Sequence, residues 1–261
     1  MALLNTHELS KSFGSVVAAD RITVSIEEKE VIGVIGANGA GKTTFVNMVT
    51  GYLKPTSGRI FFQGQDITPL SPREITHLGI CRSFQVPQVF MSLSAFDNLM
   101  IALGVVQKGV IPLLRPLRRK ELIDAAGSIL DRYGIAEYRD RETGLLPQGV
   151  RKLLDIAMAM VHNPKLVLLD EPTSGVSVSE KYGIMDVVMN ALKDLGITVM
   201  FIEHDMDIVE RYSRRILAFY DGSIVADGTP DKVLENEKVR EFVIGEEIHR
   251  KGRKKAGAKN A

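Results

Sequence analysis

The sequence has little of what marks secreted, membrane-spanning and nucleic-acid-binding proteins. It contains one cysteine, Cys81, so an internal disulfide framework is excluded and a reducing compartment is expected. Its 33 basic and 32 acidic residues nearly cancel, so no field of one sign would recruit nucleic acid. The N-terminus carries no long apolar segment, and we do not expect it to be a signal peptide.

Long hydrophobic runs are also absent. The longest run of apolar residues and glycine is "LMIALGVV" at 99–106, far shorter than the roughly 20 residues that a transmembrane helix needs. If the protein works at a membrane, a partner must span it. With 261 residues, 45% of them hydrophobic, the chain can form one large domain or two small ones around an ample core.

Strand and helix signals alternate along the chain. Buried, β-branched strands are predicted at 31–35, 165–170 and 197–204, and helical patterns follow them. This alternation predicts an α/β fold with a mainly parallel core sheet covered on both faces. Hairpins are expected around Gly64 and at Asp221-Gly222.

Three further segments are assigned from their patterns. The helix after residue 43 is expected to run to Lys54-Pro55, and helical signals dominate from about 90 to 144, where we expect an inserted subdomain. Residues 246–261 are basic and have nothing apolar to bury, so this tail is expected to be disordered.

A phosphate-binding motif follows the strand at 31–35. "GANGAGKT" matches G-x-x-x-x-G-K-[ST] between a strand and a helix, the context that this motif requires. Glycines let backbone N–H groups turn toward phosphate oxygens, and the helix N-terminus favours their negative charge. Lys42 should reach the β- and γ-phosphates and Thr43 should offer a hydroxyl to Mg²⁺. The predicted nucleotide-binding residues here are Gly36, Ala37, Asn38, Gly39, Ala40, Gly41, Lys42, Thr43 and Thr44.

Two carboxylates end the strand in "LVLLDE". Asp170 can face the Mg²⁺ shell, and Glu171 can hold a water in line with the γ-phosphate. His204 ends the strand in "FIEHD". Open α/β sheets gather ligands at this edge, so His204 is expected near Asp170.

Together these residues resemble those of an ATP-binding-cassette (ABC) ATPase over about residues 5–245. "KSFG" resembles the aromatic A-loop, which implies that Phe13 stacks on adenine. "RSFQ" resembles the Q-loop, which implies that Gln85 lies near Mg²⁺ and near a membrane subunit. The resemblance implies the ABC-ATPase form of the P-loop fold, with an antiparallel β subdomain and a helical subdomain at about 90–150. It also implies that Lys42, Glu171 and His204 are catalytic.

The signature loop of that family, usually Leu-Ser-Gly-Gly-Gln, covers the ATP of a second cassette. Here it reads Leu146-Pro147-Gln148-Gly149-Val150. Pro147 lacks both the hydroxyl and a backbone N–H, and Gln148 puts a side chain where the backbone should approach closely, although its amide could donate instead. Ser177 also stands where the D-loop usually has aspartate. We therefore expect a heterodimer in which this chain's own ATP site works and the partner's is weak. The alternative is that Gly149 and the helix dipole suffice.

Other stretches, including "VLENEKVREFVIGEE", resemble ATP-binding subunits of importers of branched-chain amino acids, urea and amides. The resemblance implies a peripheral ATPase at the cytoplasmic face of the cell membrane. Its implied partners are a second cassette, membrane permease subunits and, indirectly, a solute-binding protein. Lipid export and soluble iron–sulfur assembly remain alternative settings for such a cassette.

Overall fold

The computed structural model of this chain describes residues 2–106 and 118–245, which form two compact units. The first unit combines the two ends of the chain, up to Ile75 and from Met200 onward, and the second extends from Thr76 to Val199. The predicted basic tail at 246–261 lies outside the described residues. Within the described ranges, no helix has both the length and the apolar character to cross a membrane.

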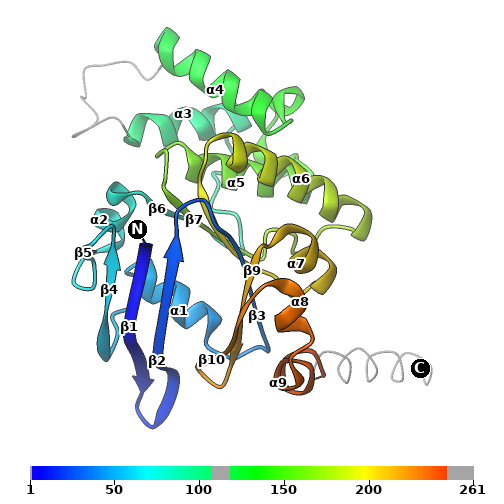
Figure 1. Cartoon of the computed structure of the whole chain (residues 1–261). Coiled ribbons are helices and arrows are strands. Elements are labelled where there is room, and N and C mark those ends of the chain that lie inside the picture. Colours follow the sequence, from blue (N-terminus) through cyan, green and yellow to red (C-terminus); the bar gives the residue numbers. More distant parts are fainter. Residues whose placement is uncertain (1, 107–117, 246–261) are drawn as a thin grey trace. The chain divides into compact units, whose positions relative to one another are not determined.

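An antiparallel sheet in the first unit confirms the predicted β subdomain. Its order is β2-β1-β4-β5. These strands are β1 (Ala2–Phe13), β2 (Val16–Glu27), β4 (Ser57–Phe62) and β5 (Gln65–Asp66), and Figure 1 shows β1, β2 and β4 side by side. The β4–β5 hairpin turns at Gln63 and Gly64, both with positive φ, which confirms the hairpin predicted around Gly64.

The first unit also holds a mainly buried sheet with the order β10-β9-β3, followed by β8. The bounds are β3 (Val31–Gly36), β8 (Thr198–Ile202), β9 (Arg215–Tyr220) and β10 (Ser223–Gly228). β3 and β9 are parallel, whereas β9 and β10 form an antiparallel hairpin through Asp221 and Gly222, as predicted. The unit boundary falls inside β8, after Val199.

The helix after the P-loop is shorter than predicted. α1 (Lys42–Val49) ends five residues before Lys54, so the expectation that it continues to Lys54-Pro55 is wrong. Gly51 takes a left-handed φ of +75° and ends the helical path, and its N–H donates to the carbonyl of Met48. The other helices assigned to the first unit are α7 (Met206–Tyr212), α8 (Pro230–Leu234), α9 (Glu237–Val239) and the π-turn η3 (Arg240–Ile244).

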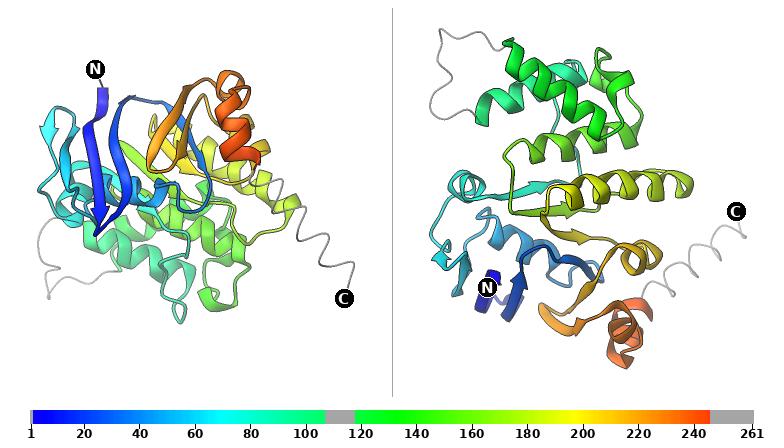
Figure 2. Two further views of the ribbon diagram at one scale, coloured as in Figure 1. Left: turned by 90° about the horizontal axis from the view of Figure 1, so that it is seen from below. Right: turned by 45° about the horizontal axis from the view of Figure 1, so that its top comes forward.

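The second unit contains two parallel strands and the four longest helices of the described residues. β6 (Ile80–Ser83) pairs with β7 (Leu166–Asp170) in parallel. The helices are α3 (Ala95–Val106), α4 (Lys120–Arg132), α5 (Gln148–Met160) and α6 (Val178–Asp194), with short 3-10 turns η1 (Ala136–Tyr138) and η2 (Thr143–Leu145). α2 (Pro72–Leu78) crosses the unit boundary. Packing joins α3 to α4 and α5, and α5 to α6 (Figure 2). The helical segment expected at about 90–150 lies within this wider unit.

Candidate nucleotide-binding site

The P-loop of the first unit connects β3 to α1. Gly41 caps α1 with a left-handed φ of +99°, and a Cβ there would lie 2.6 Å from the carbonyl oxygen of Ala18. Only glycine fits that position, because any side chain would meet the backbone of β2 and strain its own φ. The loop is therefore fixed in a tight curve at the N-terminus of α1, where backbone N–H groups favour an anion.

Lys42 is held inside this curve. Its side chain is buried, and Nζ donates to the carbonyls of Gly36 at 2.6 Å and Ala37 at 2.9 Å. A buried ammonium needs such acceptors, because an uncompensated charge in the interior is costly. The contact keeps the cation against the backbone that is predicted to cradle phosphate.

The remaining P-loop residues differ in exposure. Thr43, Asn38 and Gly39 are exposed, Ala37 and Thr44 are half-buried, and Ala40 is buried. Thr43 follows Lys42 in the chain, and a threonine hydroxyl is a group that suits a nucleotide phosphate and its cation. The loop therefore fits a nucleotide by its shape and by its donors.

Phe13 and His204, the other two predicted residues of the first unit, occupy different elements. Phe13 ends β1 with 52% of its surface exposed, and the Lys11 ammonium lies 5.2 Å from its ring centre. An exposed aromatic ring at a strand end is available for stacking. His204 is half-buried just after β8, and its backbone N–H donates to the carboxylate of the buried Glu203 at 3.3 Å.

In the second unit, Asp170 ends β7 and forms an ion pair with Arg82 of β6. Arg82 Nη2 lies 2.5 Å from Asp170 Oδ2, and the two side chains are only 7% and 10% exposed. The parallel pairing of β6 with β7 places both residues at neighbouring strand ends. The sequence prediction did not include Arg82, although a charged residue inside the strand "ICRS" was a signal.

Glu171 and Gln85, predicted on separate motifs, are brought together by the fold. Gln85 Nε2 donates to Glu171 Oε2 at 2.7 Å. Glu171 has a left-handed φ of +47°, which is rare for a residue with a side chain and occurs often at functional sites. The two residues are 86 positions apart in the sequence.

The predicted metal ligands Thr43, Gln85 and Asp170 offer oxygen atoms, the kind of donor that magnesium prefers. The described ranges contain no group of three or more His, Cys, Asp or Glu that could hold a metal ion. Mg²⁺ usually keeps several waters and binds through one or two carboxylates plus substrate phosphates, so it does not need a full set of protein ligands. The ion pair with Arg82 uses Oδ2 of Asp170.

The signature loop differs from the expected turn. α5 already begins at Gln148 and is preceded by Pro147 as its N-cap, with no hydrogen bond from a capping side chain. Gln148 Nε2 donates to the carbonyl of Ser174 in the D-loop at 3.3 Å. The amide, which sequence analysis allowed as a substitute donor, is therefore engaged within its own unit.

The D-loop position Ser177 has a structural explanation. It is the N-cap of α6 and forms a capping box with Glu180, whose carboxylate accepts from the Ser177 backbone N–H at 3.1 Å. The Ser177 hydroxyl and backbone hold the pKa of Glu180 below its usual value. Serine is among the residues that best cap a helix.

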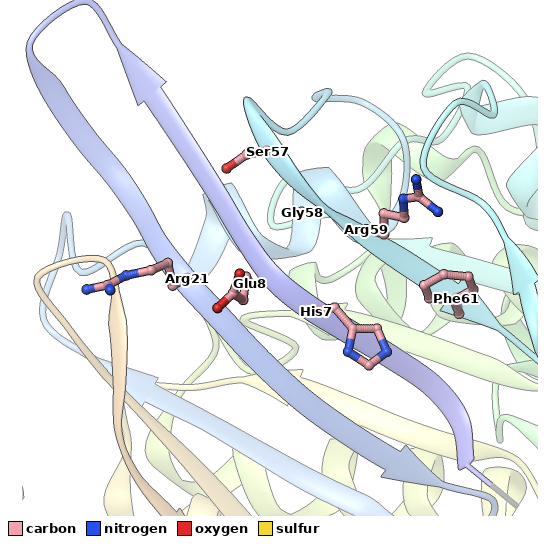
Figure 3. Close-up of a pocket in the computed structure, with 7 residues that line it drawn as sticks. All are labelled: His7, Glu8, Arg21, Ser57, Gly58, Arg59 and Phe61. Atoms are coloured by element: carbon pink, nitrogen blue, oxygen red, sulfur yellow. The ribbon is translucent and has the colours of Figure 1, made fainter.

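A pocket of about 370 Å³ lies on the antiparallel sheet and does not include the predicted site. It is lined by His7, Glu8, Arg21, Ser57, Gly58, Arg59 and Phe61. Figure 3 shows Arg21 and Arg59 pointing away from each other, while the His7 and Phe61 rings meet edge to face with centroids 5.5 Å apart.

Known proteins resemble this chain over nearly its whole length. A sequence profile of the family described as "ABC transporter" matches residues 19–174. The probable branched-chain amino acid transport ATP-binding protein LivG of Methanocaldococcus jannaschii is 36% identical over 256 residues, covering 94% of this chain and 98% of that protein. The high-affinity branched-chain amino acid transport ATP-binding protein LivG of Escherichia coli is 32% identical over 250 residues, with coverage of 94% and 98%.

A solved structure is also similar to this chain over nearly its whole length. The ADP conformation of MJ1267, an ATP-binding cassette of an ABC transporter, has a TM-score of 0.81 and 35% identity to this chain. The match covers 94% of this chain and 99% of that structure.

Proposed function

Because this chain belongs to the ABC transporter family of ATP-binding cassettes, we propose that it is the ATPase subunit of an importer for branched-chain amino acids or related small polar solutes. The observation that carries the solute class is the similarity to proteins named for branched-chain amino acid transport, which extends over 94% of the chain. As a nucleotide-binding ABC ATPase, the chain would bind ATP with Mg²⁺ and couple its hydrolysis to transport.

Each site residue has a proposed role. Lys42 and the P-loop amides bind the phosphates, and Phe13 stacks on the adenine. The cation supplies charge neutralisation at the β- and γ-phosphates, and it would be held by Thr43, Gln85 and Asp170.

Two residues act on the attacking water. Glu171 orients and polarises it, and its contact with Gln85 at 2.7 Å supports this role because it fixes where the carboxylate points. His204 stabilises the γ-phosphate as charge develops there.

The signature loop supports a second, different cassette as the partner of this chain. Pro147 offers no hydroxyl, and the amide of Gln148 donates to Ser174 instead of facing outward, which supports a weak covering of the partner's ATP. Losing one or two bonds to a charged group, each worth about 1.5–3 kcal/mol, would slow turnover roughly ten- to several-hundredfold at that site. We therefore favour a heterodimer of two different cassettes beneath permease subunits, peripheral to the cytoplasmic face of the membrane, with a solute-binding protein delivering substrate.

Steady-state ATP hydrolysis by the purified chain tests the pairing. The comparison is with Pro147→Ser/Gln148→Gly/Val150→Gln, and Lys42→Met provides the background rate. A nearly inactive chain that the repaired loop activates supports the heterodimer. Strong hydrolysis that the repair leaves unchanged makes Pro-Gln-Gly a working signature and a homodimer sufficient.

Uptake of labelled leucine, isoleucine and valine tests the solute. Cells lacking this chain are compared with cells that carry it or its Glu171→Gln variant, with labelled urea as the alternative solute. Uptake restored by the natural chain alone supports branched-chain amino acids, whereas restoration of urea uptake only would reassign the solute.

A further inference from the structure

Two buried charged side chains of α5 have no part in the roles above. Lys152 is 2% exposed and Asp155 is 6% exposed. They are three positions apart, so they project from the same side of the helix that begins at the signature loop. Charged residues on the apolar side of a helix are costly unless their bonds are satisfied, which makes their partners informative.

The partners of Lys152 are backbone carbonyls. Its Nζ donates to Phe84 at 2.7 Å, to Gln85 at 3.1 Å and to Asp170 at 3.2 Å. An ammonium has three donors, and three carbonyls from two chain segments receive them. Lys152 thereby ties the Q-loop and the end of β7 to α5.

The partners of Asp155 lie on both sides of the same loop. Its Oδ2 accepts from the Ser83 hydroxyl at 2.5 Å, and its Oδ1 accepts from the Gln88 backbone N–H at 2.8 Å. Burial raises the pKa of Asp155, while the bonds from Ser83, Gln88 and Phe84 and the charge of Lys152 lower it in part.

Lys152 and Asp155 hold the first part of the loop, whereas Phe90 near its end is bonded to Asn98 of α3. β6 ends at Ser83 and α3 begins at Ala95, and the backbone from 84 to 94 forms neither helix nor strand. Four hydrogen bonds from Lys152 and Asp155 meet residues 83–88. Within this stretch lies Gln85, whose side chain contacts Glu171.

We infer that Lys152 and Asp155 form a clamp that makes the Q-loop follow the signature helix. They are positioning residues: they touch no substrate, but they set where Gln85 lies and hence where Glu171 points. A shift of α5, whose first turn belongs to the signature loop, moves the Q-loop backbone with it. The expected fall in kcat rests on the proposed ATPase function, whereas the expected change in the Q-loop does not.

Hydrogen exchange and ATPase kinetics on the full chain together test the clamp. The variants are Lys152→Met, Asp155→Ala and the conservative Lys152→Arg, which keeps donors for the carbonyls. Leu154→Ala is the matched control, because Leu154 is fully buried on the same helix but apolar. Ser83→Ala removes a single bond to Asp155 with little change in volume, so it keeps the test valid if a larger change prevents folding.

In Lys152→Met and Asp155→Ala we expect the backbone amide hydrogens of residues 83–90 to exchange at least about tenfold faster, because the bonds between the loop and a charged side chain are lost. The exchange rates in α6 should not change. We expect kcat to fall about tenfold or more at an unchanged KM for ATP, since the P-loop is intact, with Lys152→Arg close to the natural chain. Ser83→Ala should give a smaller change of both kinds.

Two results would overturn the clamp: unchanged exchange over 83–90 in Asp155→Ala, or a fall in kcat of the same size in Leu154→Ala. If the natural chain hydrolyses no ATP, the ATPase proposal fails, and the exchange measurement still decides whether the clamp exists.

Discussion

Gly175 and Gln148 form a pair whose coupling can be measured. Gly175 has a left-handed φ of +77°, and a Cβ built on it would lie 2.0 Å from Gln148 Nε2. The two residues belong to the D-loop and the first turn of α5, both in the second unit. Gly175→Ala therefore meets two separate obstacles, one in its own backbone and one in the Gln148 side chain.

The two obstacles have different sizes. A left-handed backbone costs an alanine about 1–2 kcal/mol. The overlap is relieved when the flexible Gln148 side chain moves away, but this breaks its bond to Ser174, worth about 0.5–1.5 kcal/mol. We expect Gly175→Ala to lower the free energy of unfolding by about 1.5–3.5 kcal/mol in the natural chain, and by about 1–2 kcal/mol in a Gln148→Ala background.

Urea unfolding is measured for the natural chain, Gly175→Ala, Gln148→Ala and the double variant. The four free energies of unfolding give the coupling energy between Gly175 and Gln148, which we expect at about 0.5–1.5 kcal/mol. Gly134→Ala is the matched control: its φ is +64° in the same unit, and nothing lies within 4 Å of its added Cβ, so it carries the backbone cost alone. If Gly175→Ala costs the same with and without the Gln148 side chain, the two residues do not constrain each other and the reasoning is wrong.

Three further outcomes are expected. Glu171→Gln should retain ATP binding but trap an ATP-bound dimer in size-exclusion chromatography, and unchanged steady-state hydrolysis would remove Glu171 from its role. Tyr133→Phe should raise the free energy of unfolding by about 1 kcal/mol, because the buried Tyr133 hydroxyl has no partner among the described residues; a loss of stability in urea unfolding would contradict this. Burial raises the pKa of Cys81 to about 12, so iodoacetamide at pH 8 should label it only after unfolding, and rapid labelling of the folded chain would show that the thiol is accessible.

Local patterns were sufficient for most of the elements. The buried strands at Val31–Gly36, Leu166–Asp170 and Thr198–Ile202 lie where continuous apolar β-branched residues predicted them. The hairpin turns were predictable because Asp221-Gly222 and Gln63-Gly64 accept positive φ. The end of α1 was not, because Gly51 competes with a helical pattern that continues beyond it.

The sequence alone determined the class of the protein and its phosphate chemistry. The P-loop, "LVLLDE" and "FIEHD" are each contiguous in the sequence, so these motifs and their chemistry can be recognised without the structure. What these side chains bond to was decided only by the tertiary structure. The contacts of Gln85 with Glu171 and of Arg82 with Asp170 join residues 86 and 88 positions apart, and those of Lys152 and Asp155 reach the Q-loop across 67 to 72. The bonds of Arg82, Asp170, Lys152 and Asp155 form because these charged side chains are largely buried, and a buried charge must be paired wherever the fold supplies a partner.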